Sequence, residues 1–138
     1  MILVFQDRPG TCFAACVATL LNVELREVPQ FYDPASYGHG PLSPAVVHDI
    51  AEWFGARGLS YAEFAMPLDR DEILAMMETA NPGVTYILSG RAASGQAHAV
   101  IAGKGRIIHD PATQYPAQAV PQPCRDQYYR VGIIGLAF

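Results

Sequence analysis

Residues 11–21, TCFAACVATLL, are apolar on almost every side of a helix. Thr11 is a suitable N-cap residue, so the pattern predicts a helix from Cys12 to about Leu21. A helix that is apolar all round belongs in the interior of a domain rather than on its surface. We therefore expect this helix to run through the middle of the fold.

Capping patterns and hydrophobic periodicity predict the other elements. Ser43 before Pro44 is typical of an N-cap followed by proline at the first helical position, and Asp69 with Glu72 matches a capping box. Helices over residues 43–58 and 69–78 are expected, with strands over 84–88, 97–102, 106–110 and 128–136 and a short strand over 1–5. Helices in the first half and strands in the second half are typical of an α+β domain.

Composition excludes several classes of protein. With 138 residues, 51% hydrophobic and 16% charged, the chain is expected to form a single domain over residues 1–138. The net charge is −4 and the basic residues are scattered, so nucleic-acid binding is not expected. Apolar runs fall short of the roughly 20 residues that span a bilayer, and residues 1–5 are too short for a signal sequence. A cytoplasmic protein without membrane partners is the expectation.

Gln6 stands six positions before Cys12, at the predicted start of the buried helix. The thiolate is the nucleophilic form of cysteine, and a helix N-terminus stabilises it through free N–H groups and the helix dipole. Acyl transfer also needs hydrogen-bond donors where the oxyanion forms, and the Cys12 N–H and the Gln6 amide are two such donors. The spacing predicts a nucleophile at Cys12 beside an oxyanion hole.

A nucleophilic cysteine needs a base, and that base needs an orienting group. His98 and Asp110 lie on either side of residues 103–105, which are predicted to form a three-residue hairpin loop. In that register His98 lies directly opposite Asp110, with Cβ atoms about 5 Å apart. A two-residue loop would put the two on opposite faces, and in either register His109 points away from the Asp110 face. His98 is therefore the predicted base.

The order Gln6, Cys12, His98, Asp110 resembles that of papain-like cysteine peptidases. Within that superfamily the layout is most similar to the domains that remove double-glycine leaders from bacteriocin precursors and to small uncharacterised relatives in bacteria and their phages. The resemblance spans residues 6–111 and implies a papain-like fold, with a central N-terminal helix packed on a C-terminal antiparallel sheet. Phe13 departs from the small residue or tryptophan that often follows the nucleophile.

The resemblance also implies roles for the four residues. Cys12 would be the nucleophile, His98 the general base and later acid, Asp110 its orienting group, and Gln6 the oxyanion-hole side chain. The implied activity is that of a cysteine hydrolase, a peptidase or isopeptidase, although acyl transfer or deamidation would use the same acyl-enzyme. The implied partner is a peptide or protein substrate.

Two polar, glycine-bearing segments, 37–41 and 89–96, are close in sequence to the predicted site and are expected to wall a cleft. The candidate substrate-binding residues in them are Tyr37, His39, Gly40, Ser94, Gly95 and Gln96. Phosphate-loop and dinucleotide glycine patterns are absent from the sequence, so no cofactor is expected.

The remaining thiols leave alternatives open. Cys16 is expected to pack in the core, and Cys124, in a proline-rich segment, to be a surface thiol. Cys12 and Cys16 could instead join His98, His109 or Cys124 in a zinc site, although the paired Cys-x2-Cys knuckles common in structural zinc sites are absent. A papain-like fold with idle catalytic residues could also serve as a protein- or peptide-binding module.

Overall fold

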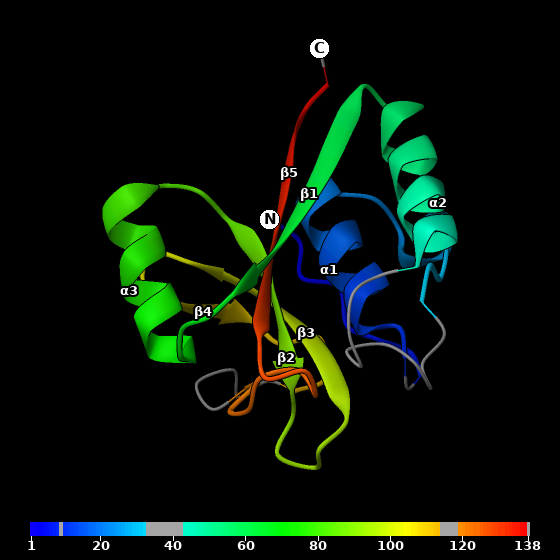
Figure 1. The fold of residues 1–138 in the computed structure, drawn as a ribbon. Coiled ribbons are helices and arrows are strands. Elements are labelled where there is room, and N and C mark those ends of the chain that lie inside the picture. Colours follow the sequence, from blue (N-terminus) through cyan, green and yellow to red (C-terminus); the bar gives the residue numbers. More distant parts are fainter. Residues whose placement is uncertain (9, 33–42, 114–118, 138) are drawn as a thin grey trace.

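The protein forms one five-stranded antiparallel sheet, in the order β1-β5-β2-β3-β4, with helices on both faces (Figure 1). The computed structural model describes residues 1–8, 10–32, 43–113 and 119–137. The helices are α1 (Cys12–Leu21), α2 (Pro44–Gly55) and α3 (Arg70–Ala80), with a 3-10 turn at Leu25–Glu27. The strands are β1 (Leu59–Met66), β2 (Tyr86–Arg91), β3 (Ala97–Gly103), β4 (Arg106–His109) and β5 (Tyr129–Leu136).

Strand alternation divides the core between the two faces of the sheet. On β2 and β3, Ile87 pairs with Ile101 and both pack in the cluster formed with α1 and α2. The next pair, Leu88 and Val100, packs in the cluster formed with α3 on the other face. The expected α+β class, with the first helix packed on an antiparallel sheet, is confirmed (Figure 1).

Helix α1 has the predicted bounds and is buried from Cys12 to Thr19. Thr11 occupies the N-cap position, but its side chain makes no capping hydrogen bond, contrary to expectation. Its hydroxyl instead donates to the carbonyl of Arg8 at 2.8 Å. The N–H groups of the first turn of α1 are therefore not capped by this side chain.

The other two helices begin as their capping patterns predict. The Val46 N–H donates to Ser43 Oγ at 3.3 Å at the start of α2, and the Asp69 N–H donates to Glu72 Oε1 at 3.3 Å in a capping box. Both helix ends differ from prediction by two or three residues, which is the usual uncertainty for helix termini. No described helix is long and apolar enough to cross a membrane.

The N-terminal residues do not form the expected strand. They run alongside α1 and β4 instead. The Val4 N–H donates to Thr19 Oγ1 at 2.9 Å, and the Val4 carbonyl lies 2.7 Å from His109 Nε2. The Gln6 N–H donates to the Pro111 carbonyl at 2.9 Å. These bonds fix Gln6 beside the end of β4.

Candidate active site

The turn between β3 and β4 is shorter than predicted. Gly103 pairs with Arg106, so the loop contains only Lys104 and Gly105, whose φ angles are 54° and 72°. Positive φ at both central residues is the geometry of a tight two-residue hairpin. The three-residue loop is therefore wrong, and this register alone would turn His98 and Asp110 to opposite faces.

A β-bulge in β4 returns His98 and Asp110 to the same face of the sheet. Ala102 pairs with Ile107, whereas Ile101 pairs with His109, so Ile108 is an extra residue in β4. One extra residue shifts the register by one and reverses which side chains share a face. Asp110, directly after β4, consequently lies diagonal to His98 rather than directly opposite it.

The His98 and Asp110 side chains are joined in the interior. His98 Nε2 lies 2.6 Å from Asp110 Oδ1, and the two residues are only 7% and 4% exposed. The Ala112 N–H donates to the same carboxylate oxygen at 2.9 Å. The Cys12 side chain lines the same cavity as His98 and acts on the ring, raising its pKa. Because Nε2 is occupied by Asp110, Nδ1 is the ring atom left for the sulfur.

The surroundings of His98 favour its protonated form. Burial lowers the pKa of the ring, but the hydrogen bonds and charges of Asp110 and Cys12 outweigh burial and raise the pKa to about 9. His98 is therefore cationic at neutral pH, where an ordinary histidine is mostly neutral. A cation beside the sulfur stabilises negative charge on the sulfur.

Cys12 is the first residue of α1 and is 3% exposed. The first turn of this helix carries no acidic residue and no side-chain cap. The positive end of the helix dipole and its free N–H groups therefore act at the Cys12 sulfur and backbone. Both the helix and the imidazole therefore direct positive electrostatic potential at this position.

Gln6 lines the same cavity as Cys12 and His98. Its side-chain Oε1 is buried and has no hydrogen-bond partner within the described part of the chain. A buried acceptor without a partner costs about 1–3 kcal/mol, and the two ends of an amide are assigned only by their hydrogen bonds. Turning the amide over would present Nε2 as a donor, which is the group an oxyanion hole requires.

The side chains of Gln6, Cys12, His98 and Asp110 line one cavity of about 410 Å³. Its other described walls come mostly from small residues, namely Gly10, Ala92, Ala93, Ser94, Gln96, Ala97, Ala112, Thr113, Ala119 and Val120. Ser94 and Gln96 thus lie where substrate-binding residues were expected. Gly95, at φ 88° in the β2–β3 turn, is not part of the described lining. The candidates Tyr37, His39 and Gly40 lie outside the described residues.

The other thiols and histidines lie apart from this arrangement. Cys16 is fully buried in the core, and burial raises its pKa. Cys124 is also buried, beside the Ser89 carbonyl, so the expectation of a surface thiol is wrong. His109 contacts Val4 and the edge of the Phe5 ring, away from Asp110. Within the described ranges no three His, Cys, Asp or Glu side chains are grouped to hold a metal ion.

Sequence reasoning missed how the Asp110 carboxylate is held. Its bond from the Ala112 N–H, two residues on, is an Asx-type turn, for which aspartate before Pro111 is a suitable sequence. The Asp-Pro pair was therefore the available signal. The T-shaped contact between the rings of Tyr32 and Phe13, with centroids 4.8 Å apart, was not predicted either.

Comparison with known proteins gives no relative: the sequence matches no family model, and no curated protein or solved structure is significantly similar to it. Any function must therefore be argued from the residues of the site.

Proposed function

We propose that this protein is a cysteine hydrolase with a papain-like fold, which cleaves peptide or isopeptide bonds through an acyl-enzyme. The observation that carries the proposal is that Cys12 and the hydrogen-bonded pair His98–Asp110 line the same cavity. Further support comes from the position of Cys12 at the start of a buried helix packed on the antiparallel sheet that bears His98.

In the first half of the reaction, Cys12 Sγ attacks the substrate carbonyl carbon. The carbonyl π electrons move to oxygen, and the oxyanion is received by the Cys12 N–H and the Gln6 amide. His98, which holds the thiol proton, passes it to the amide nitrogen as the C–N bond breaks. The amine leaves, and the acyl group stays on Cys12 as a thioester.

In the second half, water replaces the amine. His98 takes a proton from the water as its oxygen attacks the thioester carbon, and the C–S bond then breaks to release the acid. The sulfur leaves as a thiolate beside the protonated ring, which restores the starting state. Asp110 holds the ring so that one nitrogen faces the sulfur throughout, and the pKa of about 9 keeps a proton available for the leaving amine.

Peptide vinyl sulfones of varied sequence test the proposal, because a nucleophilic thiol adds to them irreversibly. Intact mass and peptide mapping should show one adduct, on Cys12, which is lost in Cys12→Ala. His98→Ala should slow its formation about 100-fold or more, since proton transfer by a positioned base contributes that much. Cys124→Ser should leave the rate unchanged.

Two results would contradict the proposal. Equal labelling of Cys12 and Cys124 would show that neither thiol is activated. Absence of any adduct when the folded protein is treated with a diverse panel of probes would show that the site is idle. It would favour the alternative of a binding module.

A further inference from the structure

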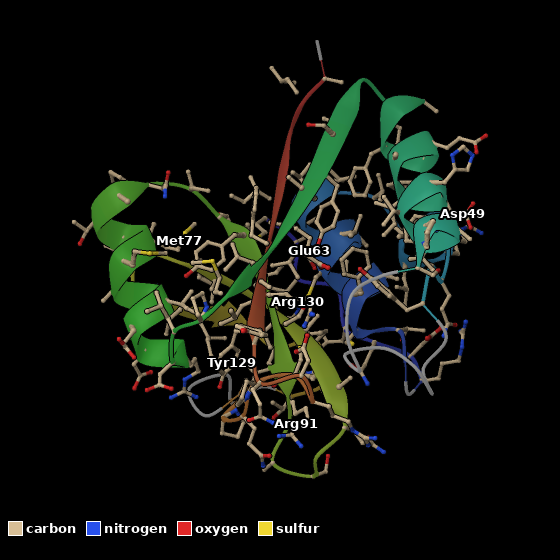
Figure 2. All side chains as sticks on the ribbon, in the orientation of Figure 1. Asp49, Glu63, Met77, Arg91, Tyr129 and Arg130 are labelled. Atoms are coloured by element: carbon tan, nitrogen blue, oxygen red, sulfur yellow. The ribbon has the colours of Figure 1, made fainter. Side chains whose placement is uncertain are left out.

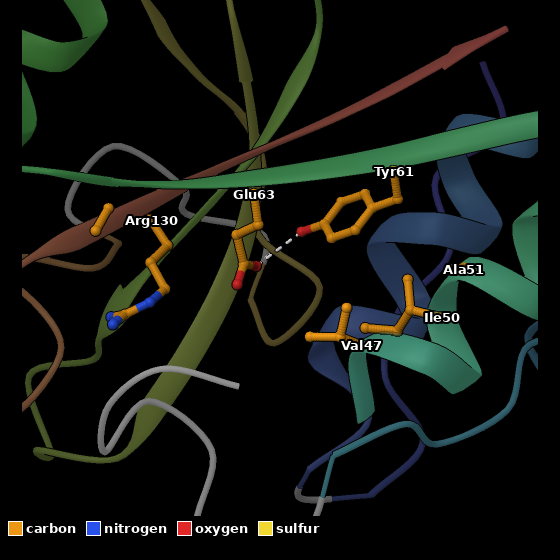
Figure 3. Close-up of a pocket in the computed structure, with 7 residues that line it drawn as sticks. Val47, Ile50, Ala51, Tyr61, Glu63 and Arg130 are labelled. Atoms are coloured by element: carbon orange, nitrogen blue, oxygen red, sulfur yellow. Dashed lines mark hydrogen bonds between the residues drawn. The ribbon is translucent and has the colours of Figure 1, made fainter. Parts of the chain in front are cut away.

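A second cavity, of about 350 Å³, lies between α2 and the strands β1 and β5 (Figures 2 and 3). Helix α2 contributes an apolar wall made by Val47, Ile50 and Ala51. The facing strands contribute polar groups, with Glu63 on β1 and Arg130 on β5. A cavity with one apolar wall and one charged wall suits a ligand that has both characters.

Glu63 faces this cavity and makes no ion pair within the described part of the chain. The Tyr61 hydroxyl donates to Glu63 Oε1 at 2.8 Å. Burial raises the pKa of Glu63, and the Tyr61 bond and the charge of Arg130 oppose that rise only in part. A half-buried carboxylate of this kind gains from an incoming cation.

Arg130 does not act as that cation, because its charge is already matched. Its guanidinium is held by both oxygens of Asp126, with Nη1 3.1 Å from Oδ1, and Figure 3 shows it turned away from Glu63. When Glu63 is ionised, Glu63, Asp126 and Arg130 together carry one uncompensated negative charge. That charge lies at the face of the cavity opposite Val47 and Ile50 (Figure 3).

We propose that this cavity binds a basic side chain, lysine or arginine, of a peptide ligand. The ammonium or guanidinium group pairs with Glu63, and the methylene stem contacts Val47 and Ile50 on α2. A long side chain with an apolar stem and a charged end matches both walls at once. Binding of the basic side chain does not depend on the chemistry of Cys12.

An aromatic link connects this cavity to the start of α1, which argues for a peptide rather than a free amine. Tyr61 lies on its wall and its ring makes a T-shaped contact with the ring of Phe13, the residue after Cys12, with centroids 5.5 Å apart. A chain held at Glu63 is thus near the helix that carries Cys12. Only the identification of the ligand as a peptide substrate rests on the proposed function.

The test uses the full chain with Cys12→Ala, so that binding is read without reaction. Nα-acetyl-lysine methylamide and Nα-acetyl-arginine methylamide are titrated while amide resonances are followed by NMR, with the norleucine analogue as the uncharged match. The basic compounds should shift the resonances of residues lining the cavity and bind about tenfold or more tightly than norleucine, the effect of a charge-assisted hydrogen bond.

Glu63→Gln should abolish this preference, because the amide keeps the shape of the side chain and its acceptor for Tyr61 but loses the charge. Glu78 is exposed on α3 at the other face of the sheet. Glu78→Gln is therefore the matched control and should keep the preference for the basic compounds. Ala51→Phe should block all binding at the cavity and serves as the second variant if Glu63→Gln has a lowered melting temperature.

Three outcomes would overturn the inference: equal binding of the lysine and norleucine compounds, a lysine preference that survives in Glu63→Gln, or absence of shifts with every compound. Preference for Nα-acetyl-glutamate methylamide would also overturn it and would identify Arg130 as the recognising group. None of these results bears on vinyl sulfone labelling of Cys12, so the two proposals fail separately.

Discussion

Asp110 Oδ1 receives two hydrogen bonds, one from the His98 ring at 2.6 Å and one from the Ala112 N–H at 2.9 Å. The backbone bond fixes the carboxylate, and the carboxylate in turn fixes the ring. The same contact contributes to the raised pKa of His98. The orientation of the His98 ring and its charge therefore both depend on Asp110 Oδ1.

Asp110→Asn should lower the pKa of His98 from about 9, because burial, which lowers the pKa, is then opposed by Cys12 alone. NMR titration of the His98 ring measures the change directly and needs no substrate. Asp49→Asn, exposed on α2, is the control and should leave the value near 9. A variant that titrates like the wild type would show that the carboxylate does not set the charge of the ring.

Gly90 lies opposite His98 on the neighbouring strand, where a side chain has no room. A Cβ there would be 2.6 Å from the Gln122 carbonyl oxygen and 2.7 Å from the Tyr129 ring. Gly90→Ala should lower the free energy of unfolding by about 1–3 kcal/mol, measured in urea, because backbone must move.

Gly55→Ala is the contrasting substitution. A Cβ at Gly55, the last residue of α2, meets nothing within 4 Å. Because glycine is a poor helix former, this variant should be as stable as the wild type or more so. Equal losses in the two alanine variants would contradict the packing described around Gly90.

At the scale of the element, the bulge at Ile108 brings His98 and Asp110 to one face. Deleting Ile108 should return Asp110 to the opposite face and break the pair. The pKa of His98 should then fall from about 9 toward or below its ordinary value, and vinyl sulfone labelling of Cys12 should slow.

Ile108→Ala keeps the number of residues in β4 and is the control for the deletion. It should lose some packing stability while keeping the His98 pKa near 9. A folded deletion variant that keeps the high pKa of His98 would show that the bulge is not what brings His98 and Asp110 to one face of the sheet.

The elements that sequence predicted well are those with local signals. Helix α1 follows from its apolar run, and the starts of α2 and α3 follow from Ser43 and from Asp69 with Glu72. These signals act within one turn of the chain, so they need no knowledge of tertiary structure.

The elements that sequence missed depend on contacts between distant segments. Strand β1 directs Glu63 into the cavity beside α2 and leaves Phe64 53% exposed. A charged residue thus faces inward and an apolar residue outward, the reverse of the alternation that predicts a half-buried strand. The Ile108 bulge has no glycine or other local mark. Cys124 is buried beside the carbonyl of Ser89 in β2, which lies 35 residues earlier in the sequence. The candidate site residues were identified from the sequence, but the diagonal placement of His98 and Asp110 was not predicted.

At the scale of the whole molecule, stability should depend on pH through His98. Its pKa is raised from 6.5 to about 9 in the folded state, so the folded protein holds a proton that the unfolded chain releases. The contribution to stability is fully present below about pH 6.5 and is lost as the pH rises through about 9. A shift of this size corresponds to about 3 kcal/mol.

Urea unfolding between pH 6 and 9.5 measures this dependence, and His98→Gln isolates it from other groups. The stability difference between wild type and variant should shrink across this range. A difference that stays constant with pH would show that the ring does not carry the extra proton. In the upper part of this range, from about pH 9, the raised pKa of Cys16 acts in the same direction, which is why the variant is needed.

The strand order has a consequence for the synthesis of the protein. Strand β5 follows the other strands in sequence but lies between β1 and β2, so β1 has no partner strand in the sheet until residues 129–136 exist. Cys12 precedes the His98 ring and the Asp110 carboxylate by some ninety residues, so it leaves the ribosome before them. A nascent chain thus carries this thiol through the synthesis of some ninety further residues before the imidazole and carboxylate that lie beside it in the folded protein exist.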